Sequence, residues 1–526
     1  MKTCWKPLLV AALLATACRT GGAEPEIPDT APPVEHGLIV LGERLDDPYT
    51  VENVNRALRS LYPTRAERVD VTPTDLYVRF LPEDESDYER LVSLGVQMMD
   101  HPLDYRIVRE GDYYHDPSLD EGAITWQYAV VPHDFVFPDD IPYELIDRCY
   151  ITEHDRSKTR SAEGIDWAAV ERESYRLTGN GALLAPETRA ESVKPSGRIT
   201  IIDPNANGGK PFGVAGVKVS CNSFVKFAST YCDRDGYYEM PTAFSATPRY
   251  RLVFKNEKGF GIGINLVLVP ASVSTLGKGE PDGMNTIVSN ASDGALFRRC
   301  VVNNAAYEYL ERCKDDDMGI KAPPADLRFW IFPHFEASST LMLHHGAVVD
   351  DEQIAKYLGK FQSVVRLFLP DITLGTAKET EYCDIYLSVV HELSHASHFS
   401  VVGRTYWNHF IDYILSSYIA SGGQMVYGDG SMPFAGYCEV GETWAYYNES
   451  KMFKERYGGV LPTFGTSFWF RPQILRYLDE RGLGRSQLFK ALTAEVNSRE
   501  KLQEKLIQLY PERQEMIDQV FERYAE

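Results

Sequence analysis

Apolar and polar positions repeat with two different periods along the chain, and the change of period separates three regions. In the first region, residues 37–155, apolar residues recur with helical spacing in VENVNRALRSLY and YERLVSLGVQMMD, whereas DLYVRFL alternates as a half-buried strand does. A mixed α/β domain is therefore predicted here. Residues 156–195 contain a predicted helix around DWAAVERESYRLTG and a polar linker.

The second region, residues 196–270, has the two-residue period of short strands. GRITIIDP, VAGVKVSC, GYYEMP and RYRLVFKN are separated by turns rich in Gly, Pro, Asn and Asp. This spacing predicts a small, separately folding β-sandwich without catalytic residues. Within it, Asp233-Arg234-Asp235-Gly236 is interpreted as a β-turn, since the remaining positions of a calcium-binding loop are missing.

From about residue 285 to residue 526 the helical period dominates. It is clear in ALFRRCVVNNAAYEYLERC, DEQIAKYLGKFQSVVRLF, YCDIYLSVVHELSHASHF and the amphipathic stretch from Pro472 onward. One apolar strand, Leu327–Phe332, is predicted among these helices. A chain of 526 residues is too long for one core. The predicted fold class is multidomain α+β: a mixed α/β domain, a small β-sandwich and a mostly helical C-terminal domain.

The polar N-terminal stretch begins with a predicted targeting sequence. Lys2 and Lys6 accompany a short apolar run, and Ala15-Thr16-Ala17 has the small residues of a cleavage site, so residues 1–17 are predicted to be a signal peptide. Cys18 follows at once. This arrangement resembles the bacterial lipoprotein signal, in which that cysteine is lipidated; secretion without a lipid is the alternative. Residues 18–36 would then tether an envelope protein to the membrane, facing the periplasm or the exterior.

Composition limits which partners the protein binds and which disulfides it can form. The 54 lysines and arginines are outnumbered by 75 acidic residues, and the net charge of −21 argues against nucleic acid or an anionic lipid surface as the main partner. The nine cysteines include no CxxC pair. Cys221 and Cys232 could form a disulfide across a β-loop. Cys300 and Cys313 lie on one predicted helix, roughly 20 Å apart, which is too far for a disulfide.

His391-Glu392-Leu393-Ser394-His395 is the strongest chemical motif in the sequence. It lies in a predicted helix, where residues four apart share one face, so both imidazoles can bind one tetrahedral zinc ion. Glu392 lies beside them and can act as a general base toward a zinc-activated water. His391 and His395 are therefore the predicted metal ligands, and Glu392 is the predicted catalytic residue.

A zinc site of this kind needs a third protein ligand. His398 is a poor candidate because it lies seven residues from His391, roughly 10 Å along the helix axis, and it is interpreted as a packed or supporting residue. A carboxylate from a later helix is the other route. Glu442 is the predicted ligand, and Glu439, one turn earlier on the same face, is its rival.

These residues resemble the zinc site of the gluzincin metallopeptidases, in which HExxH is followed, tens of residues later, by a helix with Glu-x-x-Ala. Glu442-Thr443-Trp444-Ala445 matches that pattern 47 residues after His395. Tyr446 stands where the family commonly has an Asp that braces a zinc histidine, so the supporting group is unassigned. The resemblance implies a zincin-like domain over residues 285–526.

The same resemblance implies two further elements of the site. A strand should hold the peptide extended, for which Leu327–Phe332 is the candidate, and a Tyr or His should stabilise the oxyanion. The candidate donors are Tyr437, Tyr446, Tyr447 and His409. The β-rich region in turn resembles the carboxypeptidase regulatory-like, prealbumin-type module. The segments that carry this second resemblance are Gly197–Ile201, Gly216–Val219 and Asp235–Tyr238.

The predicted function is a zinc-dependent peptidase that hydrolyses peptide bonds in peptide or protein substrates, with Glu392 as general base. The alternative is a non-catalytic binding or scaffold lipoprotein with a zincin-like domain, because two regions without a cluster of chemical side chains precede the motif.

Overall fold

The computed structural model describes most of the chain beyond the N-terminal stretch. The described residues are 38–64, 70–119, 124–155, 164–185, 194–263, 272–290, 294–314, 317–333, 338–347, 369–421, 425, 427–459, 461 and 468–524. The predicted signal peptide, Cys18, the linker to residue 36 and the helix expected at 351–368 all lie outside them.

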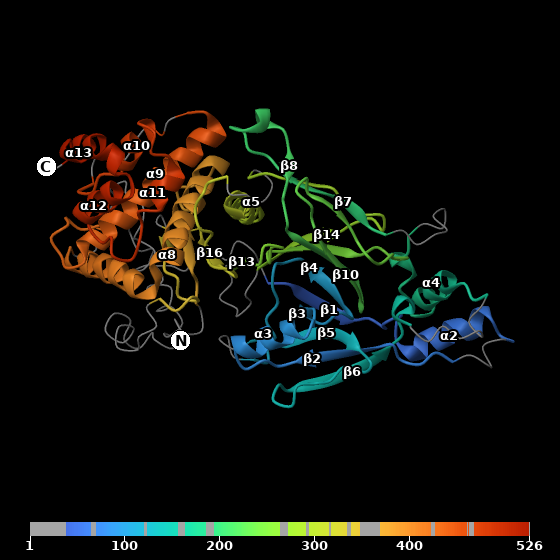
Figure 1. Ribbon diagram of the computed structural model, residues 1–526. Coiled ribbons are helices and arrows are strands. Elements are labelled where there is room, and N and C mark those ends of the chain that lie inside the picture. Colours follow the sequence, from blue (N-terminus) through green and yellow to red (C-terminus); the bar gives the residue numbers. More distant parts are fainter. Residues whose placement is uncertain are drawn as a thin grey trace.

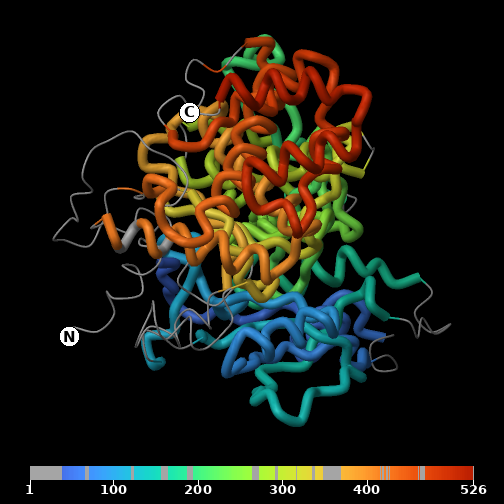
Figure 2. Tube along the Cα trace, turned by 60° about the vertical axis from the view of Figure 1, so that its left-hand side comes forward, coloured from blue at the N-terminus to red at the C-terminus, as the bar shows by residue number. Residues whose placement is uncertain are grey.

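The protein has a multidomain α+β fold, as the sequence predicted. β-Sheets make up its N-terminal half, and helices dominate the C-terminal part (Figure 1). Figure 2 shows the blue N-terminal region at one end of the molecule and the red C-terminal helices at the opposite end.

The N-terminal region is built on a four-stranded antiparallel sheet with the strand order β3-β5-β2-β6. A separate two-stranded ribbon pairs β1 with β4. The strands are β1 (Val40–Arg44), β2 (Asp75–Phe80), β3 (Met98–Met99), β4 (Tyr105–Arg109), β5 (Gln127–Pro132) and β6 (Tyr143–Cys149). DLYVRFL therefore forms an inner strand, β2, as its alternation predicted.

Three helices of this region begin where short polar side chains cap them. Thr50, Asp84 and Asp166 each accept a hydrogen bond from the backbone N–H three residues later, which satisfies a donor at the helix start. The helices are α2 (Val51–Leu61), α3 (Glu85–Ser93) and α4 (Trp167–Leu177). The helix predicted over YERLVSLGVQMMD is too long, because Gly95 at φ 79° ends it and the two methionines continue as β3.

The β-sandwich consists of two sheets whose buried side chains meet in one core. One sheet has the order β10-β9-β12-β14, and the other has the order β11-β7-β15, with β8 paired to β7. The strands are β7 (Ser196–Ile201), β8 (Phe212–Gly213), β9 (Lys218–Ser223), β10 (Lys226–Tyr231), β11 (Tyr237–Glu239), β12 (Arg249–Val253), β14 (Val273–Lys278) and β15 (Thr286–Val288).

The predicted limits of this module are corrected in the structure. Strands β14 and β15 lie beyond residue 270 but complete the two sheets, whereas β13 (Gly261–Gly263) leaves the sandwich and pairs with the C-terminal sheet. Apolar side chains of the sandwich and of the C-terminal helices belong to one continuous core. A cut at residue 270 would therefore remove two strands and expose part of a shared core.

Two smaller predictions in this module have clear outcomes. The Asp233 carboxylate accepts hydrogen bonds from the backbone N–H groups of Asp235 and Tyr237, so the segment is a turn, as predicted. Cys221 and Cys232 are both buried free thiols and are not bridged.

The C-terminal region combines a small mixed sheet with long helices. The sheet has the order β13-β16-β18-β17, in which β16 (Arg328–Phe332) and β18 (Ile372–Gly375) run parallel and β17 (Ser339–Thr340) runs antiparallel at the edge. The helices are α5 (Gly294–Lys314), α8 (Tyr382–Ala420), α9 (Ala435–Tyr457), α10 (Gln473–Glu480), α11 (Arg485–Phe489), α12 (Arg499–Leu509) and α13 (Gln514–Glu522). Cys300 and Cys313 share α5, as predicted.

Helix α8 is broken once, at Gly403, whose φ of 75° and ψ of 180° are outside the helical region. Only glycine adopts this conformation without strain, so the break is encoded by one residue. Beyond it, Trp407 and Phe410 return onto the first half of the helix, and their rings lie 5.7 and 5.4 Å from the His395 ring.

Ion pairs between buried or partly buried side chains join the N-terminal and C-terminal regions. Arg299 of α5 is 2.9 Å from Asp112 of the N-terminal region, and Arg328 of β16 is 2.5 Å from Glu85 of α3. Because a buried charge without its partner is costly, these pairs restrain how the N-terminal region docks.

Candidate metal centre

The HExxH motif lies in the first half of α8, on the face that packs against α9. His391, Glu392 and His395 are at most 4% exposed. The two helices run antiparallel, because His391 contacts Glu449 whereas the later His395 contacts the earlier Glu442. This packing brings together side chains separated by tens of residues in the sequence.

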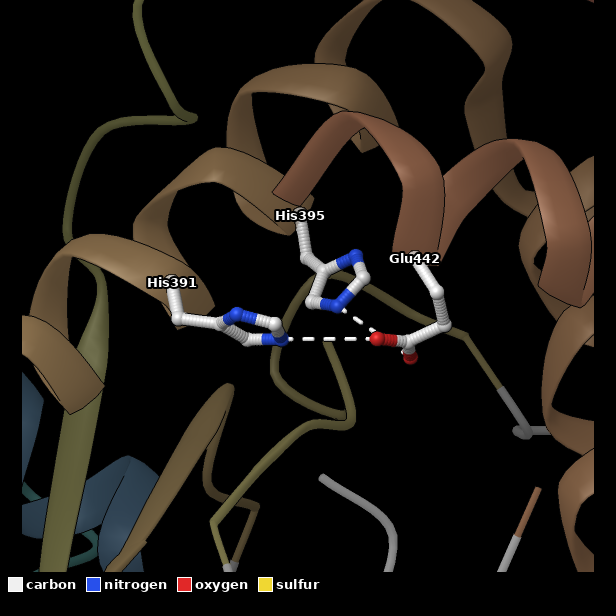
Figure 3. A group of neighbouring side chains, drawn as sticks. All are labelled: His391, His395 and Glu442. Atoms are coloured by element: carbon white, nitrogen blue, oxygen red, sulfur yellow. Dashed lines mark ion pairs between the residues drawn. The ribbon is translucent and has the colours of Figure 1, made fainter. Parts of the chain in front are cut away.

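His391, His395 and Glu442 converge on one point between the helices (Figure 3). The Nε2 atom of each imidazole lies 3.4 Å from an oxygen of the Glu442 carboxylate. Two donors that bind one zinc ion at about 2.1 Å with tetrahedral angles lie roughly 3.4 Å apart. Each imidazole therefore has the separation from the Glu442 carboxylate that one tetrahedral ion requires, and one ligand atom from each of the three residues lies within 4.8 Å of the other two.

The electrostatics of this cluster favour a cation. Burial raises the pKa of Glu442, but the imidazoles of His395 and His391 outweigh it and bring the pKa down to about 2. Burial lowers the pKa of His391, yet Glu442 and Glu449 outweigh it and raise the pKa to about 10. Both pKa shifts show that the site favours a positive charge next to the Glu442 carboxylate. A bound divalent ion would supply such a charge.

Glu449 is the supporting residue that the sequence left unassigned. Its Oε2 lies 2.9 Å from Nδ1 of His391, and its side chain is buried. If a metal ion displaces the proton on Nε2 while Nδ1 donates to this carboxylate, Nε2 of His391 can bind the metal. Glu449 lies two turns after Glu442 on the same face of α9, and this seven-residue spacing is the signal that could have identified it.

Glu392 is oriented by a threonine from the neighbouring sheet. The hydroxyl of Thr340, on β17, lies 2.8 Å from both Oε2 and the backbone oxygen of Glu392. Burial raises the pKa of Glu392. Sequence analysis missed Thr340, because nothing in a two-residue strand indicates which helix it will contact.

The rival ligands lie elsewhere. Glu439 forms an ion pair with Arg499 at 2.5 Å, so its carboxylate is neutralised away from the cluster. His398 is fully buried next to the rings of Tyr406 and Trp407, and burial lowers its pKa to about 3. It is a packed neutral residue, consistent with its exclusion as a ligand.

The four candidate oxyanion donors are now separated by their surroundings. Tyr437 accepts a hydrogen bond from Asn497, and His409 stacks on Phe434 with ring centroids 4.2 Å apart. The Tyr447 ring packs against Trp444 with centroids 5.8 Å apart, and burial raises the pKa of its hydroxyl. Tyr446 alone among the four has a ring contact with His391.

The strand expected to hold a peptide is also corrected. Leu327–Phe332 corresponds to β16, which lies between β13 and β18 and so has both edges paired. Among the described strands, β13 and the antiparallel β17 are the two edges of this sheet, and Thr340 of β17 contacts Glu392.

Comparison with known proteins adds no family to this description. No protein-family model matches the chain, and no curated protein matches it in sequence. Among the helices that the structure describes, none is both long and apolar enough to cross a membrane. The interpretation of the site therefore depends on its own geometry.

Proposed function

We propose that this protein is a zinc-dependent peptidase in which His391, His395 and Glu442 hold the metal and Glu392 is the general base. One observation carries the proposal: three buried donors converge within 4.8 Å of one another, each imidazole lies 3.4 Å from the Glu442 carboxylate, and a carboxylate bound by Thr340 lies next to them. Three protein ligands rather than four are typical of catalytic zinc sites, which keep one position for water or substrate.

The residues of the chain then have distinct tasks in peptide hydrolysis. Zinc, when bound, polarises the peptide carbonyl and lowers the pKa of the attacking water. Glu392 accepts a proton from that water as its oxygen bonds to the carbonyl carbon. As the C–N bond breaks, Glu392 returns the proton to the leaving amine. Thr340 keeps the carboxylate in place, and Glu449 holds His391 in the ligating tautomer.

The proposal includes an extracytoplasmic location with a lipid anchor at Cys18. It is supported by the signal-like residues 1–17 and by the cysteine directly after the small-residue site. Labelled fatty acid should enter the wild-type protein and not Cys18→Ser; equal labelling of both would exclude the anchor. Substrates would then be peptides or proteins of the cell envelope or its surroundings.

Metal analysis and a conservative variant test the enzymatic proposal together. Wild type should contain one zinc per chain and cleave members of a broad peptide library, whereas His395→Ala should lose the metal. Glu392→Gln preserves size and hydrogen bonding but removes the base, so it should keep zinc and lose hydrolysis by on the order of 10²-fold or more. Wild-type activity in zinc-loaded Glu392→Gln would exclude the mechanism.

A second candidate function is a binding or scaffold lipoprotein with a non-catalytic metal centre. The deep burial of the cluster favours it, because Glu442 and His395 are fully enclosed in the described structure. Stoichiometric zinc in a wild-type protein that cleaves no library peptide at any pH would support this alternative over the peptidase.

A further inference from the structure

The outer face of one sandwich sheet carries two arginines at its interface with the N-terminal region. Along β12, Tyr250 and Leu252 belong to the sandwich core. Because side chains alternate between the two faces of a strand, Arg249 and Arg251 lie on the opposite face. In Figure 1, β3 and β4 of the N-terminal region lie against this sheet, and Met99 of β3 contacts Arg251. The docked region therefore buries a face that carries positive charge.

Arg251 is a buried cation without an ion pair. It is 4% exposed, and its guanidinium donates hydrogen bonds to Asn222 Oδ1 and to Met99 Sδ, both of which are neutral. No carboxylate of the ranges given above forms an ion pair with it, and its Nε has no hydrogen-bond partner among them. Burial lowers its pKa only to about 10, and burial raises the pKa of the neighbouring Cys221 thiol to about 12, so the cation stays charged and the thiol neutral. Because an unpaired buried charge is costly, Arg251 requires a counter-charge.

A cavity of about 70 Å³ beside Arg251 has room for that counter-charge. It lies between the two regions, because Ile39 and Met98 of the N-terminal region and Val273 of β14 all line it. A water molecule needs roughly 10–15 Å³ of such a cavity, so this one holds a small ion with a few waters. The space is too small for a nucleotide or a peptide.

Most of the other charges at the cavity are already balanced. Arg249 forms an ion pair with Glu110, and Arg299 forms one with Asp112 at 2.9 Å. Burial lowers the pKa of His101 to about 3, so this imidazole is neutral at physiological pH. These residues therefore leave the charge of Arg251 unbalanced.

Asp100 is the acid at the cavity whose charge changes with pH. It is half-buried, and its Oδ2 accepts a hydrogen bond from the Tyr114 N–H at 2.6 Å. Burial raises the pKa of Asp100 to about 6, against the opposing charge of Arg251. Tyr88 and Tyr113 also line the cavity and stay neutral, because burial raises the pKa of each. Below about pH 6, Arg251 therefore has no ionised carboxylate to offset it.

We propose that this cavity binds one chloride ion on the guanidinium of Arg251, between the N-terminal region and the sandwich. A monatomic anion suits a cavity of this size, and its single negative charge matches the one unpaired guanidinium. Bound chloride stabilises the docking of the two regions, because it removes the cost of an unpaired buried charge. The site is independent of the proposed zinc centre, since none of the zinc ligands lines the cavity.

Chloride NMR measures this binding directly, because a bound chloride in exchange broadens the signal of the free ion. Sodium chloride is titrated into the purified protein, and sodium gluconate, whose anion is too large for the cavity, keeps the ionic strength constant. Wild type is compared with Arg251→Gln and with Arg485→Gln. Arg485 is the matched control: it is 5% exposed and its Nε also has no partner in the described structure, but Glu455 pairs with it at 2.6 Å.

At pH 5, wild type should broaden the chloride signal saturably, and Arg251→Gln should bind chloride at least about tenfold more weakly, as expected for a lost hydrogen bond to a charged group. Arg485→Gln should match the wild type. At pH 8 the wild-type affinity should be about tenfold lower, because ionised Asp100 then offsets Arg251. Asp100→Asn should keep its pH 5 affinity at pH 8, a gain over wild type that an unfolded variant cannot produce.

Two results would overturn the proposal. One is a wild type without saturable broadening at pH 5; the other is equal broadening by wild type and Arg251→Gln, which would place the ion elsewhere on the protein. If Arg251→Gln does not fold, Asp100→Asn decides. An affinity of Asp100→Asn at pH 8 no higher than that of wild type would contradict the assignment.

Discussion

Glu439 and Glu442 are one helical turn apart and differ in what surrounds each carboxylate. Glu442 faces two imidazoles at 3.4 Å, and Glu439 faces the guanidinium of Arg499 at 2.5 Å. A carboxylate already paired with arginine is a poor metal ligand, because binding a metal would leave the arginine without its partner. The choice between the two residues therefore depends on their neighbours rather than on their spacing from His395.

Alanine variants should separate these two carboxylates. Glu442→Ala removes one of three ligands and should release zinc under mild chelation, while Glu439→Ala should retain it. Zinc content after dialysis against a weak chelator is the measurement. The opposite pattern would move the ligand one turn earlier without changing the class of reaction.

The hydrogen bond between Glu449 and His391 should be measurable as metal affinity. Glu449→Gln preserves the side-chain shape but removes the charge that holds the His391 tautomer, and zinc affinity should fall by roughly 10- to 100-fold. Glu455→Gln is the matched control, since Glu455 lies on the same helix and pairs with Arg312 and Arg485. Competition with a chromophoric chelator gives both affinities; equal values would show that Glu449 does not support the ligand.

At the scale of elements, the helix pair α8 and α9 carries the site, and the break at Gly403 completes it. Without the break, α8 would continue straight, and Trp407 and Phe410 would not return to His395. The aromatic rings surround the second ligand and reduce its freedom to move. One backbone conformation thus couples the geometry of the second half of α8 to the metal centre.

Two glycine variants test this coupling. An added Cβ meets no atom within 4 Å at either Gly403 or Gly458, so both Gly403→Ala and Gly458→Ala act through backbone strain. Gly403→Ala should lower the free energy of unfolding by about 1–3 kcal/mol, and Gly458→Ala, at the end of α9, by about 1–2 kcal/mol. Zinc affinity should fall by roughly tenfold in Gly403→Ala alone. Equal zinc affinities in the two variants would refute the coupling.

At the scale of the whole molecule, buried ionisable side chains join regions through ion pairs, and they make the free energy of unfolding depend on pH. Asp47, between β1 and α2, is 6% exposed, and its Oδ2 has no hydrogen-bond partner within the described part of the chain. Burial, with smaller contributions from Asp104, Asp147 and Asp46, raises the pKa of Asp47 to about 8. The folded protein therefore keeps a proton on this carboxyl that the unfolded chain releases.

The sign of the pH effect follows from that proton. Between the ordinary carboxyl pKa of 3.8 and about 8, the folded state binds one more proton at Asp47 than the unfolded state, so this residue lowers stability as pH rises. Asp47→Asn keeps the oxygen that accepts from the Tyr49 N–H and removes the ionisation. Its stability relative to wild type should increase by at least about 1 kcal/mol from pH 5 to pH 8. Urea denaturation at the two pH values measures it; a constant difference would contradict the assignment.

Local features of the structure were predictable from the sequence. Thr50 and Asp166 cap helices at the positions where the apolar spacing begins, and the four-residue spacing of His391 and His395 places both on one helix face. Interactions of this kind span only a few residues, so the local sequence contains all the partners. Spacing and resemblance to a family together also selected Glu442 as the third ligand.

The tertiary structure decided everything that depends on pairing between distant segments. Glu449 and Thr340 support the site from another helix and from an edge strand, and β14 and β15 complete a sandwich that the turn spacing had ended at residue 270. Apolar periodicity predicts that a residue is buried, but it does not predict which segment covers that residue. The reason is that the hydrophobic effect is non-directional and favours any apolar partner. The sequence alone therefore determined the motif and the helix that contains it. Long-range packing determined which side chains support His391, which side chain orients Glu392, and where the domains begin and end.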